Sequence, residues 1–172
     1  MTSGKEDQKI TILPMRKKDI SAVAAIIASH DNFDGKCSEY YYREYFTSTK
    51  RVKSQLEQNF VAVDKNTGAV VGVCGFAPDK YMTPGIIWLT WFYLKKNYRG
   101  KGIGRRLLIY TINIIRKLKI KKIYLDTSSH LKYARSIKVY KKCGFNIEGT
   151  FVDYYGKGES MIIMSLDMKK KS

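Results

Sequence analysis

The segment that most restricts the fold is Ile86 to Leu94, where apolar and aromatic side chains follow one another almost without alternation. A strand that is covered on one face alternates apolar and polar residues, whereas an unbroken run is typical of a central strand covered on both faces. We therefore expect a layered structure in which helices cover both faces of a sheet that contains this segment.

The remaining pattern supplies both strands and helices. We expect strands over 10–13, 60–63, 69–76, 122–126, 146–154 and 160–166, and helices over 18–29, 39–58, 102–118 and 133–142, with a polar break at 31–35. This order predicts a single α+β domain with a mixed sheet, and 172 residues suit one domain. We assign the domain to 9–168, a disordered N-terminus to 1–8 and a basic tail to 169–172.

Composition excludes several classes of protein. No apolar run approaches the roughly 20 residues of a membrane span, and the first ten residues contain no apolar signal segment. The three cysteines are widely spaced and form neither a disulfide framework nor a metal-binding pair, so we expect a reduced, cytoplasmic protein without a metal site.

The positive charge of the chain is concentrated in one stretch. The formal net charge is +17, and the stretch from Lys95 to Lys142 holds sixteen lysines and arginines with a single acid, Asp126. Such a concentration predicts an anionic partner, which could be nucleic acid, an acidic lipid surface or a cofactor that bears phosphate.

A glycine-rich loop within this stretch favours the phosphate-bearing cofactor. Three glycines alternate between the apolar strand and an amphipathic helix, where backbone N–H groups can approach a ligand closely and the helix N-terminus attracts anions. The spacing fits neither a Walker A loop nor a dinucleotide fingerprint. The loop predicts a pyrophosphate cradle made of Arg99, Gly100, Lys101, Gly102, Ile103, Gly104 and Arg105.

Two strings of residues resemble motifs of the GCN5-related N-acetyltransferase (GNAT) superfamily. The string from Arg99 to Gly104 is similar to the R/Q-x-x-G-x-G/A motif, and Val139 to Phe145 is similar to the L/F-Y-x-K-x-G-F signature. The resemblance covers most of the chain. It implies a sheet that splays at the fourth strand, Ile86 to Leu94, with acetyl-CoA in the gap and the backbone of Tyr93 and Leu94 in contact with it.

The same resemblance implies which residues move protons during acetyl transfer. Tyr140 occupies the position of the tyrosine that protonates the departing thiolate. Asp126 is placed like the strand-five glutamate of the ribosomal-protein alanine N-acetyltransferases, and Asp153-Tyr154-Tyr155 also looks like their sequence. Two alternatives to a catalytic Asp126 stay open. Asp126 is instead the partner of a lysine in a salt bridge, or the proton is relayed by a water that the strand backbone and Ser128 hold.

The sequence thus predicts an N-acetyltransferase that uses acetyl-CoA and transfers the acetyl group directly to a primary amine in a ternary complex. The acceptor is expected to be a protein N-terminus or a small amine, because so basic a protein repels free polycations. The alternative is a nucleic-acid-binding or ribosome-associated module with vestigial acetyl-CoA binding. The protein is expected to be a monomer or a homodimer. The two histidines, His30 and His130, are expected to be exposed or to cap turns.

Overall fold

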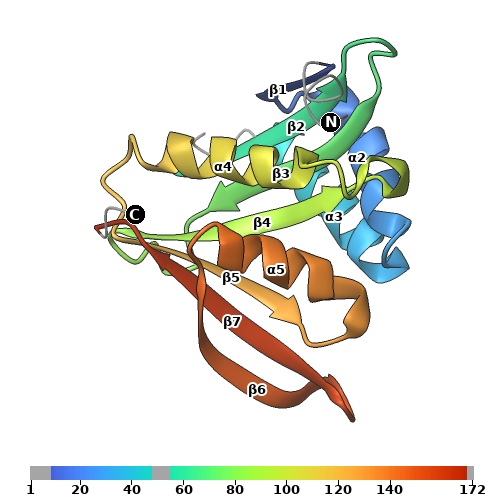
Figure 1. Ribbon diagram of the computed structural model, residues 1–172. Coiled ribbons are helices and arrows are strands. Elements are labelled where there is room, and N and C mark those ends of the chain that lie inside the picture. The colour runs from blue at the N-terminus through green and yellow to red at the C-terminus, as the bar shows by residue number, and fades with distance from the viewer. Residues whose placement is uncertain (1–8, 48–54, 170–172) are drawn as a thin grey trace. The chain divides into compact units, whose positions relative to one another are not determined.

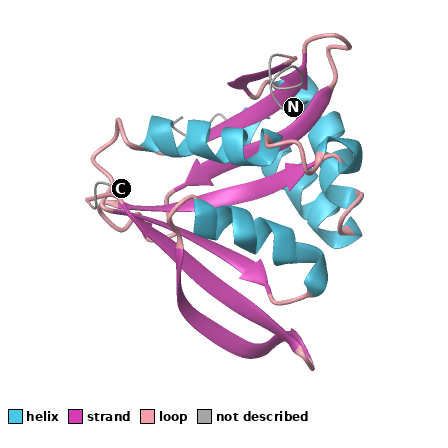
Figure 2. Ribbon diagram, viewed as in Figure 1, coloured by secondary structure: helices cyan, strands magenta, loops and turns pink. Residues whose placement is uncertain are grey.

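The computed structural model describes residues 9–47 and 55–169 (Figures 1 and 2). It divides into two compact units, the first made of Met1–Phe76 and Trp91–Thr111, the second of Ala77–Thr90 and Ile112–Ser172. The strand β4 (Ile86–Leu94) contributes its first part to the second unit and its last part to the first. The expected disordered N-terminus and the last three residues of the basic tail lie outside the described residues.

The first unit places helices on both faces of neighbouring strands. Strand β1 (Ile10–Pro14) pairs antiparallel with β2 (Gln58–Asp64), which pairs antiparallel with β3 (Val70–Ala77). Val61 and Val73 form a core with α2 (Ile20–Ala28) and α3 (Asn32–Thr47). On the other face the ring of Phe60 lies 5.2 Å from that of Tyr110 in α4 (Ile103–Ile115). The predicted covering of both faces is therefore confirmed here.

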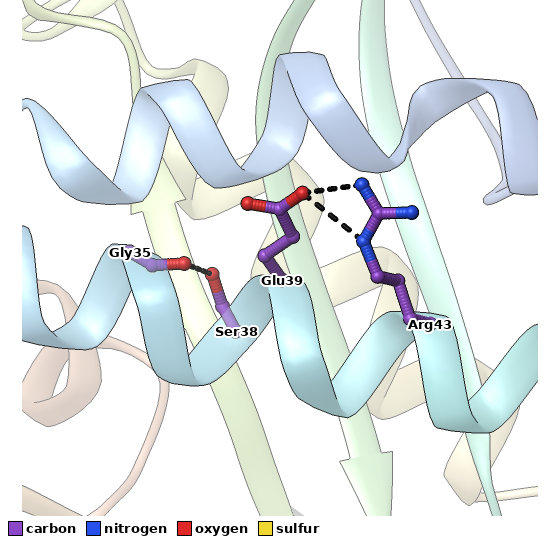
Figure 3. Close-up of polar contacts among 4 residues, drawn as sticks. All are labelled: Gly35, Ser38, Glu39 and Arg43. Atoms are coloured by element: carbon purple, nitrogen blue, oxygen red, sulfur yellow. Dashed lines mark hydrogen bonds and ion pairs between the residues drawn. The ribbon is translucent and has the colours of Figure 1, made fainter.

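Helix α3 begins earlier than the sequence suggested, at Asn32 instead of Glu39, so the predicted break at 31–35 is wrong beyond Asp31. The reason is close helix packing: a Cβ on Gly35 would stand 2.4 Å from the Cβ of Ala28 in α2. Gly35 is thus required by the approach of two helices and not by a turn. In Figure 3 the Ser38 hydroxyl donates to the carbonyl of Gly35 (2.8 Å), and Arg43 pairs with Glu39.

The C-terminal end of this predicted helix was also misplaced. Helix α3 is described to Thr47, the expected helical residues 48–54 lie outside the described residues, and Gln58 is already the first residue of β2. Helix α4 likewise ends at Ile115, three residues before the predicted Leu118. Among the described residues, no helix is both long enough and apolar enough to cross a membrane.

The second unit combines parallel and antiparallel pairing, which confirms the mixed sheet. The first part of β4 pairs parallel with β5 (Lys122–Ser128), β5 pairs antiparallel with β7 (Glu159–Asp167), and β7 with β6 (Asn146–Gly156). Helix α5 (Ala134–Lys142) precedes this β6–β7 hairpin (Figure 1). Gly144 follows the helix at φ +93°, the left-handed conformation expected for a C-terminal cap.

Strand β4 is less buried than its sequence predicts. Only Ile87 and Leu89 are buried, and the other side chains of the strand are half-buried. The register explains part of this difference, because β4 pairs with β5 over Ile86–Trp88 only, whereas β5 pairs with β7 along its whole length. The pairing of β4 with β5 is thus limited to the start of the two strands, as expected for a sheet that splays at the fourth strand.

Candidate functional site

The glycine loop has the backbone conformation that a phosphate cradle requires. Gly100 and Gly102 have φ values of +78° and +80°, a region that L side chains rarely adopt. A Cβ at either position would meet no heavy atom within 4 Å, so the space in front of the loop is open. Gly104 is different, since a Cβ there would be in van der Waals contact with the ring of Phe92 at 3.4 Å.

Helix α4 begins directly at this open space. The N–H of Arg106 donates to the carbonyl of Gly102 at 3.0 Å, so Gly102 is the N-cap, and the N–H groups of the next three residues have no acceptor within the helix. Ile103 is 2% exposed, which fixes the first turn against the core while its N–H stays available. Lys101 and Arg105 are exposed beside these donors. The arrangement suits a pyrophosphate.

Two side chains fix the loop from either side. The hydroxyl of Tyr98 donates to Asp64 at the end of β2 (2.8 Å), and the Nε of Arg99 donates to the carbonyl of Leu94 (3.0 Å). The N–H of Asn66 and the hydroxyl of Tyr98 hold the pKa of the Asp64 carboxyl below its usual value, while the same bond raises the pKa of Tyr98. The sequence alone did not identify Asp64 and Tyr98 as residues that fix the loop.

Arg99 differs from the sequence-based expectation. Besides the Leu94 carbonyl, its guanidinium contacts the ring of His30, which follows α2. Arg99 is therefore directed back toward the end of β4, so that Lys101 and Arg105 are the cations beside the glycines. His30 is half-buried and neither exposed nor a turn cap, contrary to the sequence-based expectation, whereas His130 caps the turn at Lys132.

The middle of β4 contains two irregular features. Trp91 has φ +47°, which is an outlier for a bulky aromatic residue and resembles the backbone of a β-bulge. Next to it, the Thr90 hydroxyl is buried and finds no hydrogen-bond partner among the residues that the structure describes. Outliers and unpaired buried groups of this kind cluster at ligand sites.

These observations fit acetyl-CoA. The diphosphate requires convergent N–H donors and positive charge, which the loop from Gly100 to Arg105 provides with open space in front of it. The pantetheine arm carries amides, and amides can pair with backbone groups such as those of Tyr93 and Leu94.

The second unit contains the two residues expected to move protons. Tyr140 lies in α5 at 6% exposure, with its ring 5.9 Å from that of Phe145, and the N–H of Phe145 donates to the Tyr140 carbonyl (3.1 Å). Packing thus fixes the position of the phenol. Asp126 is exposed in β5, and the hydroxyl of Tyr155 in β6 lies 3.5 Å from its Oδ2.

Asp126 and Tyr140 belong to opposite faces of the β5–β7 pair. Gly144, which follows α5, lies against Leu166 of β7, and Leu166 pairs with Ile123 of β5, so α5 packs toward the face of Ile123. Side chains alternate along a strand, and Asp126 therefore points to the other face, where Tyr155 reaches it.

The hydroxyl of Ser128, the alternative support for a proton relay, is already engaged. It donates to the carboxylate of Glu159 in β7 and accepts from the N–H of His130 (2.9 Å). These two bonds use the donor and one of the two acceptor positions of the hydroxyl, so a water could bind it only by donating to the remaining lone pair.

The chain belongs to the GNAT family of acetyltransferases, because the family model matches residues 25–145, which include the glycine loop and the Tyr140 string. The resemblance found in the sequence is thereby confirmed. Among curated proteins, the chain is similar to a probable spermine N(1)-acetyltransferase from Bacillus subtilis subsp. natto, with 34% identity over 83 residues. That match covers 48% of this chain and 51% of the relative, so the chain spans about half the length of the curated relative it matches.

Solved structures establish the fold over nearly the whole chain. A GNAT-family structure from Desulfovibrio desulfuricans has a TM-score of 0.78 at 19% identity, covering 92% of this chain and 99% of that one. The acetyltransferase yncA from Salmonella typhimurium, solved with its cofactor acetyl-CoA, has a TM-score of 0.74 at 18% identity, with coverages of 95% and 96%. The ribosomal-protein-S18-alanine N-acetyltransferase of Escherichia coli gives 0.72 at 18% identity, with the same coverages. The predicted single-domain α+β fold is confirmed.

Proposed function

We propose that this protein is an N-acetyltransferase that uses acetyl-CoA and transfers the acetyl group directly to a primary amine in a ternary complex. The observation that carries the proposal is the pair of left-handed glycines, Gly100 and Gly102, opening into free space at the N-terminus of α4 between Lys101 and Arg105. The free thiols of the three cysteines fit the cytoplasmic location that we propose with this activity.

The residues of the loop would hold the diphosphate, and the backbone at Tyr93 and Leu94 would hold the pantetheine arm. When bound, acetyl-CoA supplies an acyl group activated as a thioester. The protein must then remove a proton from the acceptor ammonium and deliver one to the departing sulfur.

Asp126 and Tyr140 are suited to these two proton transfers. The exposed Asp126 carboxylate can accept a proton from an amine that arrives on its own face of β5. Tyr140, fixed in α5 on the opposite face, can donate its phenolic proton to sulfur.

We further propose that the acceptor is the α-amine of a peptide or protein. Exposed aromatic side chains gather on β6, namely Phe151, Tyr154 and Tyr155, and a peptide offers them more surface than a free polyamine does. The net charge of +17 also disfavours a free polycation, whereas a peptide of neutral or acidic composition is not repelled. The curated relative named for spermine makes that polyamine the competing acceptor.

An acceptor screen tests the proposal. Wild-type protein is incubated with acetyl-CoA and with peptides of neutral, acidic or basic sequence, or with spermine, and thiol release is recorded together with the mass of the product. We expect acetylation of the peptide α-amine, and loss of turnover but not of acetyl-CoA binding in Asp126→Asn. Preference for spermine would refute the peptide acceptor alone, whereas absence of both acetyl-CoA binding and thiol release would refute the proposed activity.

A nucleic-acid partner is the second candidate, and the observation that favours it is the basic end of α4. Arg116, Lys117, Lys119 and Lys121 are all exposed there, which is more positive charge than one cofactor requires. Binding of RNA to this surface would weaken steeply with salt, because each phosphate contact releases a counterion. Titration of labelled RNA at several salt concentrations tests it, and equal affinity after Lys117 and Lys119 are changed to Gln would exclude this surface.

A further inference from the structure

The corner between α2 and α3 contacts the end of β4 through side chains that the proposed activity does not use. His30 lies just after α2, and Asp34 lies in the first turn of α3. Asp34 accepts a hydrogen bond from the hydroxyl of Tyr93 (2.6 Å), and the ring of His30 meets that of Tyr93 edge-on at 5.2 Å. All of these residues belong to the first unit.

The polar contacts of His30 join it to Leu94 and Arg99. Its Nε2 lies 3.2 Å from the Leu94 carbonyl and also contacts Nη2 of Arg99. A guanidinium only donates hydrogen bonds, so a nitrogen that bonds to it must accept. The Leu94 carbonyl already receives the Nε of Arg99 at 3.0 Å. The contact with Arg99 is therefore a hydrogen bond when Nε2 carries no proton and accepts from the guanidinium.

We propose that His30 is a positioning residue for the acetyl-CoA site. By accepting from Arg99, the neutral imidazole holds the guanidinium on the Leu94 carbonyl and so fixes the last residue of β4 relative to Gly100. The inference rests on the proposed function, since it assumes that the loop beginning at Gly100 binds acetyl-CoA.

The remaining contacts keep His30 in place for this role. The Tyr93 ring supports one edge of the imidazole, and the bond to Asp34 prevents that ring from turning away. The preceding residue, Tyr98, is held by its own bond to Asp64, which does not depend on His30. Loss of His30 should therefore loosen the loop without unfolding it, and the cost should appear in cofactor affinity because a looser loop must be ordered on binding.

The test compares acetyl-CoA affinity, measured by calorimetry, with steady-state kinetics for wild type and five variants. His30→Leu removes the acceptor nitrogen and keeps an apolar side chain against Tyr93, whereas His30→Gln restores a group that can accept from Arg99. The matched control is His130→Leu, which changes the other histidine, an exposed residue of the second unit. Wild type is the reference.

We expect His30→Leu to weaken acetyl-CoA binding about tenfold, equivalent to about 1.4 kcal/mol, with kcat at saturating acetyl-CoA changed less than about twofold. His30→Gln should recover most of the affinity, and His130→Leu should behave as wild type. In the double variant with Arg99→Ala, His30→Leu should cost nothing further, because both changes remove the same contact.

Two different failures can be told apart. If wild type binds acetyl-CoA and His30→Leu binds equally well, His30 has no positioning role and the proposed function stands. If wild type does not bind acetyl-CoA, the proposed function falls and the inference with it. A loss in kcat without a loss in affinity, or additive losses with Arg99→Ala, also overturns the inference. Should His30→Leu not fold, the comparison of His30→Gln and Arg99→Ala with wild type decides it.

Discussion

The substitution Gly102→Glu is the most direct test of the proposed phosphate cradle. Gly102 has φ +80° and no heavy atom within 4 Å of a Cβ position, so a side chain there meets no steric clash and costs only the left-handed backbone. That cost is about 1–2 kcal/mol, which lowers the melting temperature of a chain of this size by about 2–8 °C. The protein should remain folded, because typical stabilities are about 5–15 kcal/mol.

The effect on acetyl-CoA should be far larger than the effect on stability. The new side chain fills the space in front of the first turn of α4, and its carboxylate repels the diphosphate. Loss of two charge-assisted hydrogen bonds at about 1.5–3 kcal/mol each weakens binding by at least about a hundredfold. Calorimetry with acetyl-CoA measures this loss directly.

Gly68 provides a matched control within the same unit. It has φ +70° in the turn between β2 and β3, with nothing within 4 Å of its Cβ position, so Gly68→Glu imposes the same backbone strain and the same charge away from the loop. The two variants should melt within a few degrees of each other, and only Gly102→Glu should lose acetyl-CoA. Equal affinity in the two variants would refute the placement of the diphosphate at α4.

Three further predictions follow from other residues. Tyr140→Phe keeps the ring packed against Phe145 and should lower kcat about a hundredfold at unchanged acetyl-CoA affinity, as stopped-flow thiol release would show; unchanged kcat removes the phenol as the acid. Because the pKa of Asp64 is lower in the folded than in the unfolded protein, its carboxylate stabilises the fold above the unfolded pKa, and this stabilisation is lost as the pH falls through the folded pKa. In urea titrations Tyr98→Phe should therefore be less stable than wild type near pH 7 and equally stable near pH 2. Burial raises the pKa of the Cys74 thiol to about 12, so mass spectrometry after brief iodoacetamide treatment at pH 8 should find half-buried Cys143 alkylated before Cys74.

Features that depend on neighbours in the sequence were predictable. The alternation of glycines before an amphipathic helix located the loop at Gly100 to Gly104, and the glycine after α5 located its left-handed cap. The final hairpin was recognised from Gly156-Lys157-Gly158 between two apolar runs, and its strands extend only a residue or two beyond the predicted ends. These features are local because backbone preference and side-chain period act over a few residues.

The errors of prediction lie where packing overrode a local preference. Gly35 looked like part of a turn, yet it lies in the first helical turn of α3, because only glycine lets that helix approach Ala28. The side-chain contacts of Arg99 were also not foreseen, since its guanidinium bonds to Leu94 and contacts His30. In both cases the deciding neighbour comes from another element, and a single sequence does not reveal which element that will be.

Residue type and spacing along the chain determined the fold class and the position of the phosphate loop, and the resemblance of two strings to GNAT motifs determined the family and the candidates Asp126 and Tyr140. Only the tertiary structure decided that Tyr98 bonds to Asp64, that Asp34 bonds to Tyr93 and that His30 meets Arg99. It also decided that Asp126 and Tyr140 lie on opposite faces of the β5–β7 pair. The physical reason is that periodicity tells which face of an element is buried, whereas the partner of a polar side chain depends on how distant segments pack.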